Sequence, residues 1–384
     1  MRTPEAQIKA AILHPEAEIR EVATRYFADS HNADVSVMPL VIQAVEKYGR
    51  ERTCRLLCIA DHLVQTPTTI QWLMAELRRS YDLNDLPQDN YRCIVAGAIC
   101  KADPHLLAPV KDEILALPAF TRQFQHDLIP QAQRAKWDWP TGWKALQEWG
   151  ESTMEAEGVG YWDAGSVDAI VRALGRFREQ GGETVLNLLH RRYRGYPKRL
   201  MQWLEPQLVT LAGEMKLEAA IPLLIDRLHE GDDPVANAVG PALAKIGTEE
   251  IIHALAKDWP EGDEDFRCSA MDVFELLHCD LSVQMALKFL PEEEDIDMAC
   301  GLGFALLHNF AEEGVEPVRK LVLREGDGKY GGDMGDLRRR LIAVATIMNQ
   351  PFLEYPAWYK EAVDAKWGMR KLSPWRPTVP QDKP

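Results

Sequence analysis

The sequence of 384 residues has no long apolar run, the feature that identifies membrane-spanning proteins, and no cysteine spacing typical of secreted disulfide proteins. No uninterrupted apolar stretch approaches the roughly 18 residues of a membrane span. The N-terminus has only a short Ala-Ala-Ile-Leu run, broken by His14 and Pro15, so we expect no secretory signal and a cytoplasmic protein. Seven cysteines without any Cys-x-x-Cys spacing favour reduced thiols over a disulfide framework.

Motifs of enzymes and of cofactor sites are also missing. The chain has no Gly-x-Ser-x-Gly elbow and no His-Glu-x-x-His, and its ten histidines are scattered. We therefore expect no catalytic residues, no cofactor and no metal. Alternating β-branched patterns of useful length are absent too, which predicts a fold without a sheet.

A short helical pattern is present instead, and it returns eight times. It consists of an acidic or polar residue, two spacers, an apolar residue that Arg usually follows, two spacers and a small or apolar residue. The apolar anchors are separated by 35, 37, 80, 64, 31, 32 and 39 residues, and they stand at positions 19, 54, 91, 171, 235, 266, 298 and 337. Such a period predicts a stack of helix pairs.

The stretch from Met215 to Leu255 shows one unit. Apolar residues repeat with helical spacing on both sides of a polar turn that contains Asp232 and Asp233: Ala219, Leu223 and Leu228 before the turn, and Val235, Val239, Leu243 and Ile246 after it. Neither helix buries its apolar face alone, so neighbouring pairs have to stack. Helix starts are predicted at Thr66-Pro67 and Asp103-Pro104, where a polar cap precedes Pro at the first helical position.

These residues resemble HEAT repeats, a family of antiparallel helix pairs. The resemblance implies an all-α fold, a right-handed α-solenoid of stacked pairs, in which turn acids and second-helix arginines form an internal ladder. Matched to the pattern, the ladder arginines are Arg20, Arg55, Arg92, Arg172, Arg267 and Arg338. The ladder acids are Asp168, Asp232, Asp263 and Asp295, and Ala236 and Ala299 replace Arg in two units.

Acidity is concentrated in one segment of the chain. Residues 201 to 300 contain 6 Lys and Arg against 22 Asp and Glu, whereas the formal net charge of the whole chain is −15. This field repels phosphates and attracts a basic partner. We expect the contact residues to be Asp232, Asp233, Glu261, Asp263, Glu264, Asp265, Glu292, Glu293, Glu294 and Asp295. The alternative is that these carboxylates only solvate helix ends.

The pattern weakens between residues 118 and 162. We therefore predict HEAT-like repeats at 1–117 and 163–372, a Trp-rich junction at 118–162 and a disordered Pro-rich tail at 373–384. The junction contains Trp137, Trp139, Trp143, Trp149 and Trp162, and we expect Pro140 and Gly142 to interrupt its helices. The favoured interpretation is that the rings fill an irregular joint. The alternative is an exposed aromatic platform for a peptide or a base.

Two further clusters have a functional and a structural interpretation. Cys54, Cys58 and His62 are spaced as metal ligands on one helix, but they spread over about 12 Å of its axis, so buried core thiols are the simpler account. A basic-aromatic cluster comprises Arg191, Arg192, Tyr193, Arg194, Tyr196, Lys198 and Arg199. It suits phosphate contacts and base stacking, or the ends of helices.

The loop at 324–340 is rich in Gly and Asp but matches no P-loop, dinucleotide or EF-hand spacing, so we interpret it as an insertion between repeats.

HEAT-like DNA glycosylases combine Trp, Asp and Arg on a basic face, and here the Trp and Arg clusters lie in different units. We therefore expect a non-catalytic scaffold or adaptor that binds a basic protein, with an inhibitor of a basic toxin or nuclease as a more specific version. Nucleic-acid binding through residues 191–199 is the alternative.

Overall fold

The computed structural model describes residues 2–82, 84–155, 164–191, 195–230, 233–325 and 333–365. These residues form helices and no strand, apart from one isolated antiparallel bridge between Arg2 and Ala311. The all-α expectation is therefore confirmed. Among the described residues, no helix is both long enough and apolar enough to cross a membrane.

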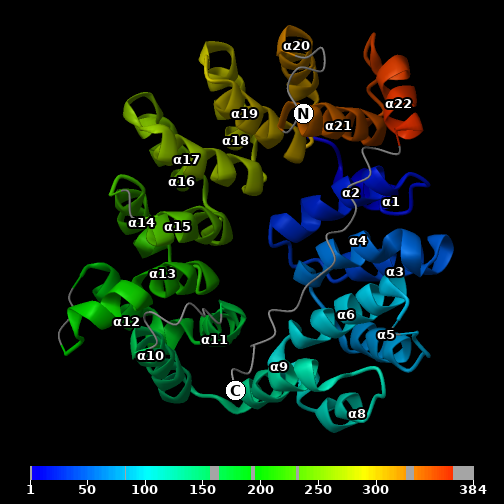
Figure 1. Ribbon diagram of the computed structural model, residues 1–384. Coiled ribbons are helices and arrows are strands. Elements are labelled where there is room, and N and C mark those ends of the chain that lie inside the picture. The colour runs from blue at the N-terminus through cyan, green and yellow to red at the C-terminus, as the bar shows by residue number, and fades with distance from the viewer. Residues whose placement is uncertain are drawn as a thin grey trace, which may run out of the picture.

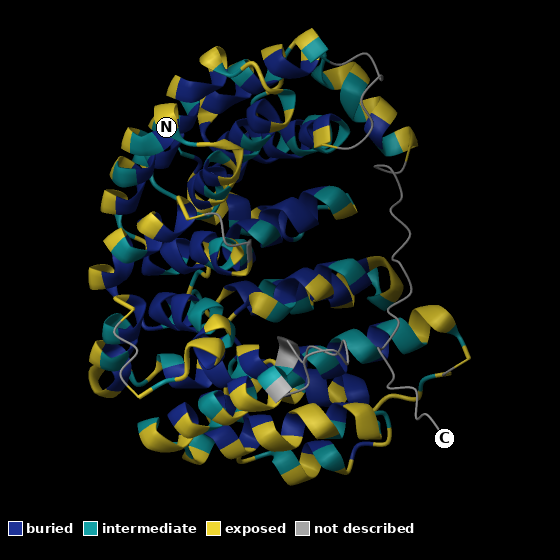
Figure 2. Cartoon of the chain, turned by 60° about the vertical axis from the view of Figure 1, so that its left-hand side comes forward, coloured by how far each residue is buried: buried dark blue, intermediate teal, exposed yellow. Residues whose placement is uncertain are grey.

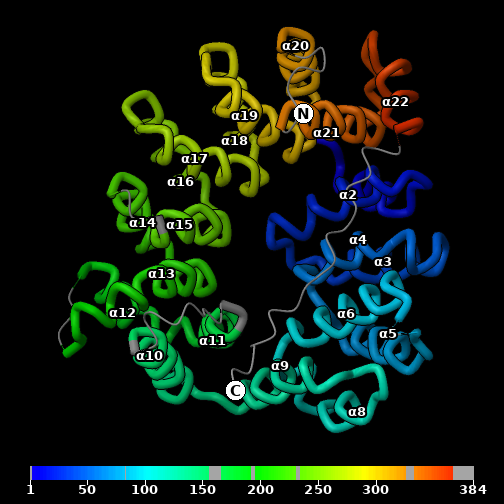
Figure 3. Tube along the Cα trace, in the orientation of Figure 1, coloured from blue at the N-terminus to red at the C-terminus, as the bar shows by residue number. Residues whose placement is uncertain are grey.

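The helices form two layers that together make a ring (Figures 1 and 3). The inner layer comprises α2 (Ala17–Asp29), α4 (Arg50–Ile59), α6 (Leu86–Cys100), α9 (Arg122–Gln133), α11 (Ala164–Gly175), α13 (Lys198–Glu214), α15 (Asp233–Ile246), α17 (Glu264–Leu276), α19 (Ile296–His308) and α21 (Asp333–Met348). Consecutive inner helices pack side by side along this series. Between α9 and α11, the short 3-10 turn η2 (Arg134–Lys136) makes the connection.

The outer layer covers the inner helices from outside the ring. It comprises α1 (Glu5–Ala11), α3 (Val37–Tyr48), α5 (Pro67–Leu77), α7 (Pro104–Leu107), α8 (Lys111–Leu115), α10 (Trp139–Glu155), α12 (Arg178–Leu189), α14 (Ile221–Leu228), α16 (Glu249–Asp258), α18 (Asp280–Phe289), α20 (Val315–Glu325) and α22 (Tyr355–Asp364). Buried residues concentrate between the layers, and exposed residues occur at the turns and along the helices (Figure 2). One hydrophobic core extends around the ring.

The sequence pattern explains the local structure well. Thr66 caps α5 with a reciprocal capping box, and Asp103 accepts a hydrogen bond from the N–H of His105 at the start of α7, as Pro67 and Pro104 predict. All four predicted apolar residues of α15 are buried. In the preceding helix Leu228 is buried and Leu223 half-buried, but Ala219 is exposed because α14 begins only at Ile221, after the 3-10 turn η3 (Glu218–Ala220).

The two ends of the helix series pack against each other and close the ring. The Gln7 Nε2 atom on α1 donates a hydrogen bond to the carbonyl oxygen of Ile347 on α21, over 2.6 Å. The N–H of Thr3 donates to the carbonyl oxygen of Phe310 over 3.0 Å. In an open stack the last pair leaves one apolar face to be capped. Here α1 and α2 cover that face of α21.

Aromatic packing reinforces the closure at its centre. The Tyr26 ring of α2 is 4% exposed and stacks on the His278 ring with centroids 4.1 Å apart. It also meets the Phe310 ring edge-on at 5.4 Å. Arg2 donates to the carbonyl oxygen of His278 over 2.5 Å and to the carboxylate of Asp280 over 3.0 Å. Residues about 250 to 285 positions apart in the chain thus form one contact.

The Trp-rich region is more regular than expected. Pro140 lies in the first turn of α10, and Gly142 lies inside this continuous helix, so the predicted interruption is wrong. Gly142 is small enough for close packing, because a Cβ atom there would lie 2.6 Å from the Leu174 side chain. The Trp143 ring is buried and stacks on the Trp139 ring at 5.2 Å.

The two other described tryptophans of this region, Trp137 and Trp149, are half-buried against the core. The structure therefore supports the interpretation in which these rings fill a joint. Trp162, the segment 326–332 of the predicted loop and the tail at 373–384 lie outside the described residues.

Candidate functional site

The predicted acidic contact residues lie on successive turns at the N-terminal ends of the inner helices. We define the acidic edge as residues 259–265, between α16 and α17, and residues 290–297, between α18 and α19. Because α17 packs on α19 and α16 on α18, these two turns come from neighbouring helix pairs. Asp232 and the side chain of Asp233 lie outside the described residues.

Some carboxylates of the acidic edge have structural roles. Asp263 accepts a hydrogen bond from the N–H of Phe266 and caps α17. Asp295 accepts from the N–H groups of Asp297 and Met298 and caps α19. Such caps satisfy amides that have no partner within the helix. These two residues therefore help to set the shape of the turns.

Other carboxylates of the acidic edge are exposed and, among the described residues, have no hydrogen-bond or ion-pair partner. These residues are Glu261, Glu264, Asp265, Glu292 and Glu294. The negative charge of both turns acts on the Cys268 thiol of α17, whose pKa is raised. Partial burial is the largest cause, and the carboxylates of Asp272, Glu264, Asp265 and Asp295 raise this pKa further. The edge thus presents uncompensated negative charge to solvent.

Glu293 belongs to the same turn but points elsewhere. Its side chain is 8% exposed, and its carboxylate lies 3.3 Å from the Arg267 guanidinium on the preceding inner helix. This ion pair joins one helix pair to the next. Glu293 is therefore a structural residue of the edge and is not available to a partner.

The ladder arginines do not pair with the ladder acids among the described residues. Arg55 contacts Glu21 at 2.9 Å, Arg92 contacts Asp89 at 2.6 Å and Arg338 contacts Glu361 at 2.5 Å. Each of these three acids lies at a different sequence separation from the arginine that it contacts.

Two more ladder arginines, Arg20 and Arg172, form neither the predicted pairs with ladder acids nor, among the described residues, ion pairs like those of Arg55, Arg92 and Arg338. Arg20 donates to the backbone carbonyl groups of His14 and Pro15, over 2.7 Å in each case. Arg172 is exposed and has no such contact among the described residues, and neither does Asp168 one helical turn earlier. The repeated sequence positions therefore hold side chains with different tasks.

The basic-aromatic cluster is partly neutralised and partly buried. Arg191 forms ion pairs with Glu230 and, at 3.7 Å, with Glu205. The Tyr196 hydroxyl accepts a hydrogen bond from the Trp143 indole over 3.2 Å, and this ring is half-buried. Lys198 and Arg199 are exposed at the start of α13, whereas Arg192, Tyr193 and Arg194 lie outside the described residues.

The Cys54, Cys58 and His62 stripe is not continuous. Cys54 is buried as expected, but Cys58 is exposed, which corrects the interpretation of both as core thiols. His62 belongs to the 3-10 turn η1 (Ala60–His62) after α4, and its Nε2 atom lies 3.2 Å from Asp61. No group of three or more potential metal ligands occurs in the part of the chain that the structure describes.

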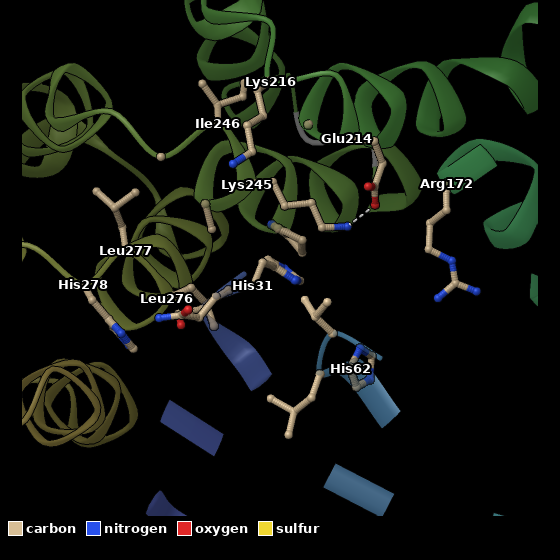
Figure 4. Close-up of a pocket in the computed structure, with 18 of the residues that line it drawn as sticks. His31, His62, Arg172, Glu214, Lys216, Lys245, Ile246, Leu276, Leu277 and His278 are labelled. Carbon is tan, nitrogen blue, oxygen red and sulfur yellow. Dashed lines mark hydrogen bonds and ion pairs between the residues drawn. The ribbon is translucent and has the colours of Figure 1, made fainter. Parts of the chain in front are cut away.

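A site that the sequence reasoning missed lies at the opposite ends of the inner helices. The central cavity has a volume of about 1030 Å³ and is lined by the C-terminal ends of α2, α13, α15 and α17 and by η1 (Figure 4). His31 and His62 line it from the turns after α2 and α4, and Arg172, Lys216 and Lys245 from α11 and from the ends of α13 and α15. Only the curvature of the ring brings these groups together.

No family model, curated protein or solved structure matches this chain. The arrangement of its own residues therefore has to support any functional statement.

Proposed function

We propose that this chain is a HEAT-like α-solenoid closed into a ring, which acts as a non-catalytic scaffold and binds a basic surface of another protein at the acidic edge. The five exposed and unpaired carboxylates of the two turns carry the proposal. Stacking of the helix pairs brings turns about 30 residues apart in the chain next to each other and so concentrates their charge. A negative surface of this kind speeds the association with a basic partner and selects against acidic ones.

Nucleic-acid binding through residues 191–199 is less well supported. Tyr196 is engaged by Trp143, so its ring is not free to stack on a base, and Arg191 already lies between two glutamates. A polyanion bound there would also lie next to the acidic segment. We therefore favour a protein partner.

The test compares two charge-matched variants. In the edge variant, Gln replaces Glu261, Glu264, Glu292 and Glu294. In the control, Gln replaces four other exposed glutamates, namely Glu151, Glu179, Glu183 and Glu312. Both lose the same net charge. Each protein is immobilised and exposed to extract of the source cells, and bound proteins are identified at low and high salt.

We expect the wild type and the control to retain the same basic protein at low salt, and the edge variant to lose it. Equal retention by both variants would contradict the proposal. Tight binding to heparin, with a steep salt dependence that a Lys198→Gln, Arg199→Gln variant abolishes, would support the nucleic-acid alternative instead.

A further inference from the structure

Two histidines lie beside the contact that closes the ring. His278 belongs to the turn between α17 and α18, and its ring stacks on the Tyr26 ring of α2. His308 is the last residue of α19, and its ring centroid lies 5.3 Å from that of His278. His278 also lines the central cavity (Figure 4). A proton added to His278 would therefore act directly on the closure.

The surroundings of His278 suit a neutral imidazole better than a charged one. Its Nε2 atom is enclosed by protein and has no hydrogen-bond partner among the described residues. In an imidazolium both ring nitrogens are donors, so Nε2 would become a buried donor without an acceptor, which is unfavourable. The face of the Tyr26 ring attracts a cation, but it offers no acceptor to Nε2.

The acids around His278 are already paired with other groups. The Asp280 carboxylate lies 3.0 Å from the Nε atom of Arg2, and the Glu275 carboxylate lies 2.8 Å from the Nδ1 atom of His308. The Arg2 guanidinium also donates to the carbonyl oxygen of His278 over 2.5 Å. Burial is the main cause that holds the pKa of His278 well below its usual value, and the charges of His308 and Arg2 lower this pKa further.

The segment that His278 helps to hold is short. Residues 2–11 contain only α1, a helix of 7 residues that packs on α2 and α21. Its polar contacts with the far end of the chain include those of Thr3 and Gln7 with backbone carbonyl groups. Glu5 is exposed on α1 and raises the pKa of the Tyr26 hydroxyl, but it is not among the charges that act on His278. A helix as short as α1 is not stable without packing.

We propose that protonation of His278 opens the ring by releasing α1 and the Tyr26 side chain from the far end of the chain. In the open state water surrounds the imidazole, and Arg2 and His308 no longer oppose its charge. The closed state has the lower affinity for the proton. Its advantage is therefore complete above the usual histidine pKa of 6.5 and decreases as the pH falls below this value.

Hydrogen–deuterium exchange of the full chain, followed by mass spectrometry between pH 7.5 and 5.5, measures this opening. After correction for intrinsic exchange rates, the amides of α1 report the release, and those of α5, which lies away from the closure, serve as a reference. We expect α1 to be less protected than α5 at both pH values. The protection factor of α1 should fall about tenfold over this range, the effect of one proton taken up below pH 6.5.

Two variants assign the proton. His278→Phe keeps a ring against Tyr26 and cannot titrate, so the tenfold change in α1 should disappear. The control is His31→Asn. His31 also lines the central cavity and has its pKa lowered to about 4, mainly by burial, but it belongs to none of the closure contacts described above. This variant should retain the wild-type change.

The proposal also makes a prediction for the wild type alone. Well below pH 6.5, the logarithm of the α1 protection factor should fall by about one per pH unit, the slope for one proton. A protection factor that does not change with pH would overturn the proposal. Equal protection of α1 and α5, or loss of the pH dependence in His31→Asn, would overturn it as well. None of these outcomes depends on a partner at the acidic edge.

Discussion

The two ends of the inner helices form different surfaces from the same repeating unit. At the N-terminal ends, the acidic edge holds exposed carboxylates without partners. At the C-terminal ends, about 20 Å away for a helix of 13 residues, turns from both halves of the chain meet around the central cavity. There the Glu214 carboxylate is ion-paired with Lys245, and charges of both signs without a partner among the described residues, including Arg172, Lys216 and Asp168, line the cavity.

The difference lies in how each surface is assembled. The acidic edge needs only neighbouring helix pairs, so an open stack would also present it. The central cavity needs the whole ring, because His31 and Lys245 lie on opposite sides of it. A change that opens the ring should therefore abolish the cavity and leave the acidic edge intact.

The largest expected effect comes from Tyr26→Ala at the ring closure. This substitution removes a buried ring that packs on His278 and Phe310, and it should cost about 3 to 5 kcal/mol of unfolding free energy. Urea denaturation measures the loss. Leu353→Ala, at a side chain that is 84% exposed, is the control and should change little. A cost below about 1 kcal/mol for Tyr26→Ala would show that closure contributes little to stability.

Gly213→Ala tests the packing that shapes the cavity wall. A Cβ atom at this position would lie 2.6 Å from the Cα atom of Ala242, so α13 and α15 would have to separate. We expect a loss of about 1 to 3 kcal/mol of unfolding free energy. Gly97→Ala is the matched control, because its Cβ atom meets nothing within 4 Å and should stabilise α6 by about 0.5 to 1 kcal/mol. Equal effects of the two substitutions would contradict the close approach.

His278 should make the ring closure sensitive to pH. Burial, and then the charges of His308 and Arg2, hold the pKa of His278 well below its usual value of 6.5. The unfolded chain therefore takes up a proton below pH 6.5 that the folded chain does not, and stability falls as the pH decreases. Between pH 7.5 and 5.5 this residue should account for about 1.4 kcal/mol.

His278→Phe keeps a ring beside Tyr26 and removes this titration. Urea midpoints at the two pH values should therefore differ less in this variant than in the wild type. His253→Phe, at an exposed position on α16, should retain the wild-type difference. An unchanged pH dependence in His278→Phe would disprove the assignment.

The smallest effect is expected at the acidic edge itself. Asp295→Ala removes the cap of α19 and should cost about 1 kcal/mol, whereas Asp295→Asn keeps an oxygen acceptor and should cost much less. Thermal unfolding distinguishes the two. Equal destabilisation of the two variants would show that the negative charge of Asp295 matters more than its hydrogen bonds. Asp295 would then belong with the five carboxylates of the acidic edge that have no partner among the described residues.

Local features of the fold were predictable from the sequence, but its closure was not. Val235, Val239 and Leu243 specify the buried face of α15, and Thr66-Pro67 specifies the start of α5, because these signals act within a few residues. The contact of Tyr26 with His278 depends on small rotations accumulated over the whole stack, and no short pattern records their sum.

The same limit applied to the candidate sites. The acidic edge was visible because its carboxylates are adjacent in the chain, although Asp263, Glu293 and Asp295 proved to have structural contacts. Arg172 was interpreted as a ladder residue, since its position in the repeat matches that of Arg55. Only its place in the central cavity, opposite His31, suggests a different role.

Closure of the ring is the claim on which both surfaces depend, and photo-crosslinking tests it most directly. A benzophenone amino acid is introduced at Gln7 on α1, an exposed position whose native side chain contacts the Ile347 carbonyl group, and at Glu46 on α3 as a control. We expect the Gln7 derivative of the monomer to crosslink to the tryptic peptide 341–360, and the Glu46 derivative not to do so. Crosslinks from position 7 that reach only residues near it in the chain, or only a second molecule, would contradict the closed ring.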